Sequence, residues 1–280
     1  MSFTTLDEAP QIMNGALPGV FSVSATQLIR FSQGNLQYIG SSSAPYWKFA
    51  ENQWDYLGNN GQGSTSQNVD RDLFGWGTSG FNHGATAYQP WKTSTVSSQY
   101  YAYGQPEYHL YDQTGQADWG YNAISNGGNT TGIWRTLTEN EWKYLFNTRV
   151  TANGIRFAKA QVNDVNGVVL LPDDWSADVY DLNDTNQNNA NFDSNVISSL
   201  EWNSLEAAGA VFLPAAGDRY GTYLTWTSQE GNYWSASRGP DNYGDQFATF
   251  IKFDNSSLTA NICTDRYMGF SVRLIRPVEN

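Results

Sequence analysis

Paired carboxylates are the residues of this chain whose type and spacing could do chemistry most directly. Glu139 with Glu141, and Asp173 with Asp174, are pairs of the kind that glycoside hydrolysis uses. Glu141, however, stands three positions after Thr138 in a capping box, where its carboxylate would accept a hydrogen bond from a backbone amide. The two aspartates lie in a predicted turn. Neither spacing is diagnostic of catalysis, so we interpret both pairs as structural.

Nucleophilic and metal chemistry have less support. The chain has two histidines, His83 and His109, and one cysteine, Cys263, too few for a thiolate zinc site or an internal disulfide. The stretch from 181 to 193, DLNDTNQNNANFD, is rich in oxygen ligands. Its sixth and twelfth residues are Asn186 and Phe192, where a calcium loop of the EF-hand type requires Gly and Glu. We expect a solvated loop there and no cofactor, with a structural calcium ion left open.

Charge and composition argue against several classes of partner. The 280 residues contain 15 Lys and Arg against 27 Asp and Glu, a net charge of −12, which opposes binding to nucleic-acid phosphates. No apolar run is long enough for a transmembrane helix, so no membrane insertion is expected. The N-terminus lacks the basic start and apolar run of a signal peptide. The 15% aromatic content indicates a folded chain.

Hydrophobic periodicity and turn signals predict the elements that position any site. Residues 1–18 resemble a polar leader, and residues 19–280 a single domain. Alternation predicts strands within 20–39, whereas 40–130 predicts long loops pinned by aromatic side chains. Short strands are expected at 154–162, 168–171, 210–213, 232–235, 249–253 and 270–275, with a turn at 163–167. Together with the helices described next, they indicate the α+β class.

Two helices carry start signals. The first follows the capping box at Thr138, with Trp142, Leu145 and Phe146 on one face. The second covers 199–208, where Ser198 and Glu201 form another capping box, Trp202 and Leu205 face inward, and Gly209 ends the helix.

Several stretches resemble segments of formylglycine-generating-enzyme-type domains. Residues 134–144, WRTLTENEWKY, are similar to the R-L-P-T-E-x-E-W-E-Y segment of those domains. Residues 212–217, FLPAAG, and 233–237, YWSAS, resemble later strands, and 269–274, GFSVRL, resembles the closing strand. With 31–38, FSQGNLQY, and 72–77, DLFGWG, the pattern is most similar to a group of Bacteroidales surface and phage-associated proteins.

This resemblance implies a C-type-lectin-like fold of the formylglycine-generating-enzyme type, with small twisted antiparallel sheets, two main helices and long irregular loops. Several such relatives are variable proteins diversified by a diversity-generating retroelement, and their binding residues lie in the segment that is 238–268 here. The oxidase branch binds copper through two cysteines, and Cys263 has no second cysteine in the chain. Gln105-Pro106-Glu107 is similar to the sugar-binding tripeptide of C-type lectins, but no W-N-D follows. The resemblance therefore implies neither enzyme activity nor calcium-dependent sugar binding.

The segment 238–268 can also be interpreted physically. Alternation in 248–253 predicts that Ile251 and Phe253 pack inward while Phe250 and Lys252 point outward. Residues 259–265 mix polar and apolar types without a period, which predicts a strand followed by a loop that displays unrelated side chains. Each of these seven residues can be reached from an AAY codon by changing only its adenines, whereas Lys252 and Met268 cannot. Arg266 and Arg273 are expected to brace the sheet.

We therefore expect a non-enzymatic ligand-binding protein of the adhesin or receptor-binding type, extracellular, cell-surface or virion-associated. Its partner would be a protein or glycan on another cell or particle. Two alternatives stay open: a carbohydrate-binding or carbohydrate-active protein using the loops at 40–130, and a structural pilus or virion tip subunit docked through residues 1–18. The expected ligand-binding residues, aromatic and Arg anchors with polar neighbours, are Arg238, Asn242, Tyr243, Asp245, Phe250, Lys252, Asp254, Thr259, Asn261, Ile262, Cys263, Thr264, Asp265 and Tyr267.

Overall fold

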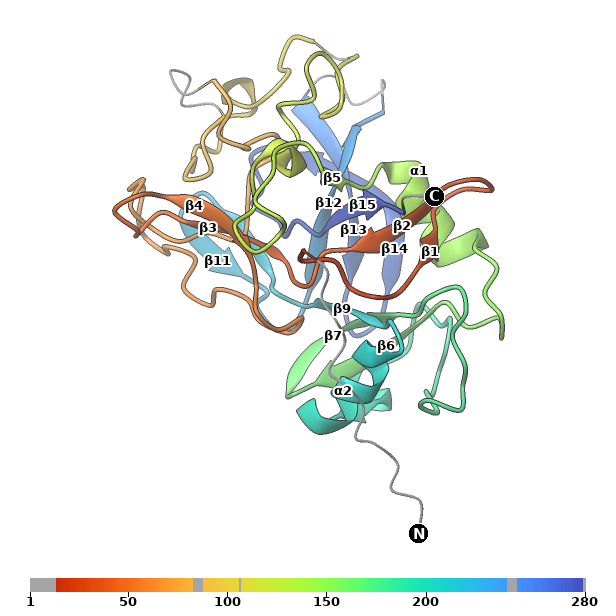
Figure 1. The fold of residues 1–280 in the computed structure, drawn as a ribbon. Coiled ribbons are helices and arrows are strands. Elements are labelled where there is room, and N and C mark those ends of the chain that lie inside the picture. Colours follow the sequence, from red (N-terminus) through yellow and green to blue (C-terminus); the bar gives the residue numbers. More distant parts are fainter. Residues whose placement is uncertain (1–13, 83–87, 106, 241–245, 279–280) are drawn as a thin grey trace.

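A computed structural model describes residues 14–82, 88–105, 107–240 and 246–278. Within these ranges the chain is a mixed α+β structure, built mostly from small antiparallel sheets with two α-helices (Figure 1). This confirms the α+β class expected from the sequence. No helix in the described ranges is both long and apolar enough to cross a membrane.

The strands form five small sheets. One contains β1 (Phe21–Ser22), β2 (Leu28–Phe31), β15 (Leu274–Pro277) and β5 (Arg135–Thr136), in that order, so it joins the two ends of the described chain. A second contains β8 (Val196–Ile197), β6 (Phe157–Val162), β7 (Val165–Leu170) and β9 (Val211–Pro214). The remaining sheets are the pair β3 (Leu36–Ile39) and β4 (Tyr46–Phe49), the pair β10 (Asp218–Tyr220) and β11 (Tyr223–Thr225), and the three strands β12 (Gly231–Arg238), β13 (Phe247–Phe253) and β14 (Leu258–Asp265).

Both predicted capping boxes are present. Helix α1 (Glu139–Lys143) begins after Thr138 and runs into a π-helical turn, η4 (Tyr144–Thr148), and helix α2 (Ser199–Ala207) begins after Ser198. Gly209 follows α2 with a φ of +93°, a left-handed conformation that suits glycine. The described part of the chain also contains the short 3₁₀ turns η2 (Ser97–Gln99), η3 (Trp119–Tyr121) and η5 (Phe192–Ser194).

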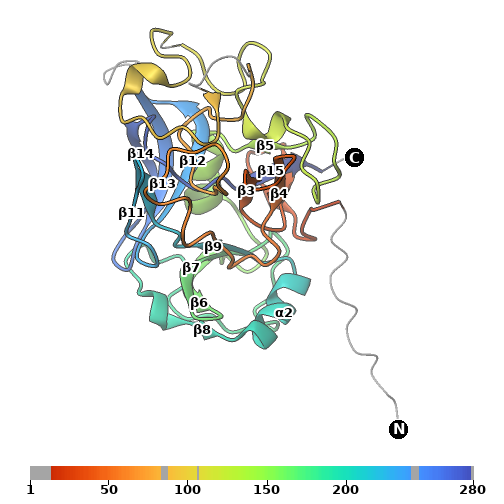
Figure 2. The same cartoon turned by 90° about the vertical axis from the view of Figure 1, so that its left-hand side faces the viewer.

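Three hydrophobic clusters hold these elements together. One lies between α1, η4 and the inner faces of several sheets and includes the fully buried Trp142. A second, rich in aromatics, lies under the long loops and includes Trp76, Trp119 and Trp234. The third packs α2, through Trp202, against the β6–β9 sheet. Figure 2 shows this last layer at the bottom and the long loops at the opposite end. The expectation that most tryptophans anchor the loops and core is confirmed.

The chain between β4 and β5 contains only short 3₁₀ turns in its described part, which agrees with the prediction of long loops there, but the prediction over 40–130 missed β4, which pairs with β3. Their aromatic side chains pin them to the body: Tyr100 is 3% exposed and Trp119 is fully buried. A buried aromatic ring supplies enough apolar area to fix a loop that has no backbone ladder of its own.

Two boundaries differ clearly from the sequence predictions. Residues 14–18, assigned to a leader, belong to the fold, because Leu17 is fully buried and its amide donates to Phe31 at 2.9 Å. The predicted turn at 163–167 is a two-residue turn at Asn163 and Asp164, both with positive φ, a combination that suits a tight hairpin. Residues 165–167 already pair with β6.

Candidate functional site

The described part of the predicted ligand-binding segment, 238–268, supplies the last residue of β12 and all of β13 and β14 in the three-stranded sheet β12-β13-β14. Within the described residues β14 pairs only with β13, so it is the edge strand of this sheet. Residues 259–265, predicted to leave the strand for a loop, all lie within β14. The signal overlooked was the alternation of buried Leu258 and Ala260 with exposed Thr259 and Asn261, which is the period of a strand.

The C-terminal half of β14 has no fully buried side chain. Five consecutive residues are partly or fully exposed, and Tyr267 follows them, also partly exposed. We call this set the display surface: Asn261, Ile262, Cys263, Thr264, Asp265 and Tyr267. All six belong to the predicted set of binding residues, and the structure brings them together along one strand edge.

A rigid framework lies directly beneath the display surface. Arg266, between two display residues, is fully buried and donates from Nη1 to the carbonyl of Tyr101 at 2.6 Å. Its guanidinium lies 4.7 Å from the ring centroid of Trp76, a favourable cation–π distance. Arg273 is also fully buried and donates to the Gln53 side chain at 2.7 Å. The expectation that Arg266 braces the sheet is confirmed, because it also donates to the Phe247 carbonyl of β13. Arg273, in contrast, donates to Gln53 and to the Phe212 carbonyl of β9, outside this sheet.

Phe250 corrects the prediction that it points outward. Its side chain is 5% exposed and packs against Phe270 and Trp234, with ring centroids 4.6 and 5.9 Å away. Alternation identified the two faces of β13 correctly, since Ile251 and Phe253 pack into the other cluster. Both faces of this central strand are covered, however, so neither face is open to solvent. Phe250 is therefore part of the core and not of the display surface.

The other predicted residues are divided. Arg238 lies at the end of β12 nearest the loops and is partly exposed. Lys252, Asp254 and Thr259 lie at the opposite end of the sheet, around the β13–β14 turn, where Lys252 donates to Glu230 at 2.7 Å. They do not join the display surface. Asn242, Tyr243 and Asp245 lie outside the described residues.

The long loops approach the display surface, which sequence reasoning did not predict. Ser97, in η2, donates from its hydroxyl to Asp265 at 2.8 Å. His109 accepts a hydrogen bond at Nδ1 from the amide of Arg238 at 3.2 Å, and its ring stacks on Tyr111 with centroids 4.8 Å apart. The two hydrogen bonds join residues separated by more than 100 positions, so no local pattern could have shown them.

Tyr267 is held at the edge of the display surface by two neighbours. Its ring meets Tyr220 edge to face, with centroids 5.7 Å apart. Burial, together with a hydrogen bond to Asp265 and the charge of that carboxylate, raises the pKa of Tyr267 to about 12. The phenol is therefore neutral at physiological pH and can donate or accept hydrogen bonds to a ligand.

Cys263 borders a pocket of about 340 Å³ that Pro240, Thr249, Asn261 and Ile262 also line. Burial, and to a smaller extent the charge of Glu139, raises the pKa of its thiol. A thiol with a raised pKa is a weak nucleophile. Cys263 is better suited to contact a ligand than to react with one.

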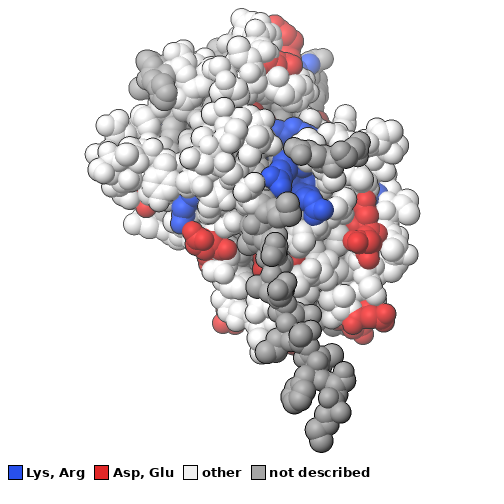
Figure 3. Space-filling view, viewed as in Figure 1, with Lys and Arg blue, Asp and Glu red and all other residues white. Residues whose placement is uncertain are grey.

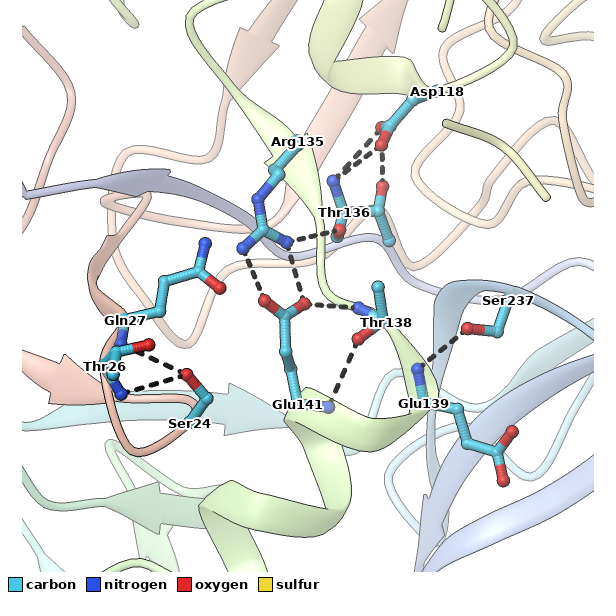
Figure 4. Close-up of polar contacts among 10 residues, drawn as sticks. All are labelled: Ser24, Thr26, Gln27, Asp118, Arg135, Thr136, Thr138, Glu139, Glu141 and Ser237. Carbon is cyan, nitrogen blue, oxygen red and sulfur yellow. Dashed lines mark hydrogen bonds and ion pairs between the residues drawn. The ribbon is translucent and has the colours of Figure 1, made fainter. Parts of the chain in front are cut away.

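Helix α1 supports the sheet from behind through a polar network (Figure 4). Arg135 donates to Glu141 through both of its terminal nitrogens, at 2.8 and 2.5 Å. The Glu141 carboxylate also accepts from the amide of Thr138, which completes the capping box. The next amide, that of Glu139, donates to Ser237 on β12 at 3.1 Å. The contacts of Glu141 therefore give it a structural role, as predicted from the sequence. Asp173 also has a structural role, because it accepts a hydrogen bond from the buried Arg149 at 2.9 Å.

The loops contain a second pocket, of about 360 Å³, lined by Phe81, Tyr88 and Tyr100–Tyr103 among others. Tyr103, Tyr111 and Tyr121 are 40–48% exposed, so a few aromatic rings in the loops are open to a ligand. This pocket is the feature that corresponds to the alternative site at 40–130.

Charge is distributed unevenly on the face shown in Figure 3. Basic side chains gather over β2, β5 and β15, where the register sets Arg30 opposite Arg276, while the upper part of this face, over the loops, is mostly uncharged.

No group of three or more acidic, His or Cys side chains that could hold a metal ion occurs in the described part of the chain. A structural calcium ion stays a prediction.

Comparisons with protein-family models, with curated proteins and with solved structures found no match to this chain. Its function is therefore inferred from the residues and geometry given above.

Proposed function

We propose that this protein is a non-enzymatic ligand-binding protein of the adhesin or receptor-binding type, acting at a cell surface or on a virion. The display surface would contact a protein or glycan on another cell or particle, and the scaffold beneath it would be C-type-lectin-like. The observation that carries the proposal is the contrast within one strand. Asn261 is exposed and Ile262 to Asp265 are partly exposed, while Arg266, the residue that follows the strand, is fully buried in a fixed framework.

This arrangement suits recognition for a physical reason. A binding surface gains affinity when its side chains are pre-positioned, because less conformational entropy is lost on association. Here the backbone of β14 is fixed by its ladder with β13 and by Arg266. The exposed side chains can then be exchanged without changing the backbone that presents them. Such a surface also fits the proposal that the segment is diversified between variants.

The proposal is tested by a variant with four display residues replaced: Asn261→Ala, Thr264→Ala, Asp265→Ala and Tyr267→Ala. Fluorescently labelled protein is added to a panel of bacterial cells and to a glycan array. We expect saturable binding by the natural chain and at least a 100-fold loss in the variant, since interface anchors contribute about 2 kcal/mol or more each. The melting temperature should fall by less than about 5 °C.

A variant of α2, with Leu200→Ala, Asn203→Ala and Ser204→Ala, is the matched control, because these side chains are exposed on the other end of the molecule. It should bind as the natural chain does. Unchanged binding by the display variant would refute the proposal, as would its unfolding. Loss of binding on Tyr103→Ala and Tyr111→Ala alone would instead favour the loop site, and release of reducing sugar would favour an enzyme.

A further inference from the structure

A groove of about 510 Å³ lies at the end of the β12–β14 sheet away from the display surface. Four segments meet there: the β6–β7 hairpin, η5, the chain between β11 and β12, and the β13–β14 turn. Several of the surrounding elements are labelled in Figure 2. The side chains that matter for its chemistry are Trp226, Asn166, Gln161, Asn255, Glu230 and Asp193. None of the six belongs to the display surface.

Trp226 is an unusual residue in this groove. Its side chain is 54% exposed, although most tryptophans of the chain are in the core. Its φ is +55°, a conformation that costs a bulky residue about 1–2 kcal/mol. Asn or Gly would adopt this backbone more readily, so local stability does not explain an exposed indole here. Such outliers concentrate where a side chain must be presented to a ligand.

The chain that bears Trp226 is held in place. The Trp226 carbonyl accepts from the amides of Gln229 and Glu230 at 2.9 and 3.0 Å. The amide of Ser228 donates to Ala215 at 2.9 Å, and its hydroxyl is 2.8 Å from that of Tyr56. The indole is therefore presented on a fixed backbone, which lowers the entropy lost when a ligand stacks on it.

The other residues that line the groove offer hydrogen-bonding groups without a net positive charge. Asn166 donates to the Ser228 carbonyl at 2.8 Å, while its Oδ1 is buried and has no partner within the described residues. Buried polar atoms are normally satisfied, so an unpaired one marks a place for a ligand or ordered water. Gln161 and Asn255 add amide groups that can both donate and accept. Glu230 is paired with Lys252 at 2.7 Å, whereas the carboxylate of Asp193 adds a negative charge that disfavours an anionic ligand.

We infer that this groove is a second binding site and that it takes a neutral oligosaccharide, one sugar ring lying against the Trp226 indole. The apolar face of a pyranose matches an exposed aromatic ring, and its hydroxyls match amides, which donate and accept, and carboxylates, which accept. The volume falls within the range of small-molecule sites. The site is separate from the display surface, so its failure would leave the proposed function intact.

The experiment measures binding of soluble neutral oligosaccharides (maltoheptaose, cellohexaose, xylohexaose, mannohexaose and N-acetylchitohexaose) by calorimetry, with tetragalacturonate as the anionic counterpart. We expect saturable binding of at least one neutral chain and none of tetragalacturonate. Trp226→Asn should weaken binding at least tenfold, and its melting temperature should stay within about 3 °C of the natural value, because Asn accepts positive φ.

Tyr223→Asn is the control, since Tyr223 is 66% exposed three residues away and does not line the groove. It and the four-residue display variant should bind the sugar normally. The inference is overturned if no neutral oligosaccharide binds, if Trp226→Asn leaves binding unchanged, or if the display variant loses it.

Discussion

Replacing Arg266 by alanine is expected to lower the free energy of unfolding by about 3–5 kcal/mol. The guanidinium is fully buried, donates to the carbonyls of Tyr101 and Phe247, and lies over the ring of Trp76. Alanine removes these interactions together, leaves the Tyr101 carbonyl without its donor and opens a cavity in the aromatic cluster, whereas the Phe247 carbonyl keeps the hydrogen bond from the amide of Gly239. The loop that carries Tyr101 should loosen as well, because Arg266 joins it to the sheet.

Urea denaturation followed by fluorescence measures this change, and Thr264→Ala is the matched control. Thr264 lies two residues away and is partly exposed, so its replacement should cost less than about 1 kcal/mol. An Arg266→Lys variant should recover only part of the loss, since one ammonium cannot reproduce the planar guanidinium over an indole. Equal effects of Arg266→Ala and Thr264→Ala would contradict the division between framework and display residues.

Stability should fall as the pH rises from 5 to 7.5, by about 2–3 kcal/mol. Asp72 is the main cause: burial, partly offset by hydrogen bonds from Leu57 and Asn60, raises its pKa to about 7. Over this range the native state holds a proton that the unfolded state has lost, so raising the pH favours unfolding. The contribution is complete below the ordinary pKa of an aspartate and disappears as the pH passes about 7.

Unfolding curves at pH 5 and 7.5 for the natural chain and for Asp72→Asn check this expectation. The variant should be less stable at both values, because an amide N–H replaces an acceptor, yet its stability should change less with pH. Part of the slope should persist, since burial also raises the pKa of Asp118 and of Asp218. A variant with the same slope as the natural chain would show that Asp72 is ionised throughout.

Local signals in the sequence predicted much of the fold. Both capping boxes and the helix faces of Trp142 and Trp202 were identified, because their stabilising contacts lie within four residues. The prediction that Gly209 ends the second helix also rested on residues close to it in the sequence. Strand positions were found where turn residues bounded them, though their ends shifted by several residues.

The errors came from contacts that sequence distance conceals. Phe250 was assigned to solvent because alternation cannot show that both faces of β13 are covered, one by α1 and the other by Phe270. The proximity of Ser97 to Asp265 of the display surface, and of His109 to Arg238, depends on loop packing across more than 100 residues. No pattern in the sequence distinguished Trp226 from the other tryptophans, since its positive φ and its exposure arise from the surrounding backbone. The sequence therefore located the segment that contains the candidate site, whereas the tertiary structure determined which residues of that segment belong to the site.

The central claim is that β14 separates replaceable display residues from an irreplaceable framework. A saturation scan of residues 258–269, with each variant scored for folding by resistance to protease on the cell surface, tests it most directly. We predict that Asn261, Cys263, Thr264 and Asp265 accept most amino acids, while Ala260, Arg266 and Gly269 accept very few. Intolerance spread evenly along the strand would contradict the claim, because the segment would then be core throughout.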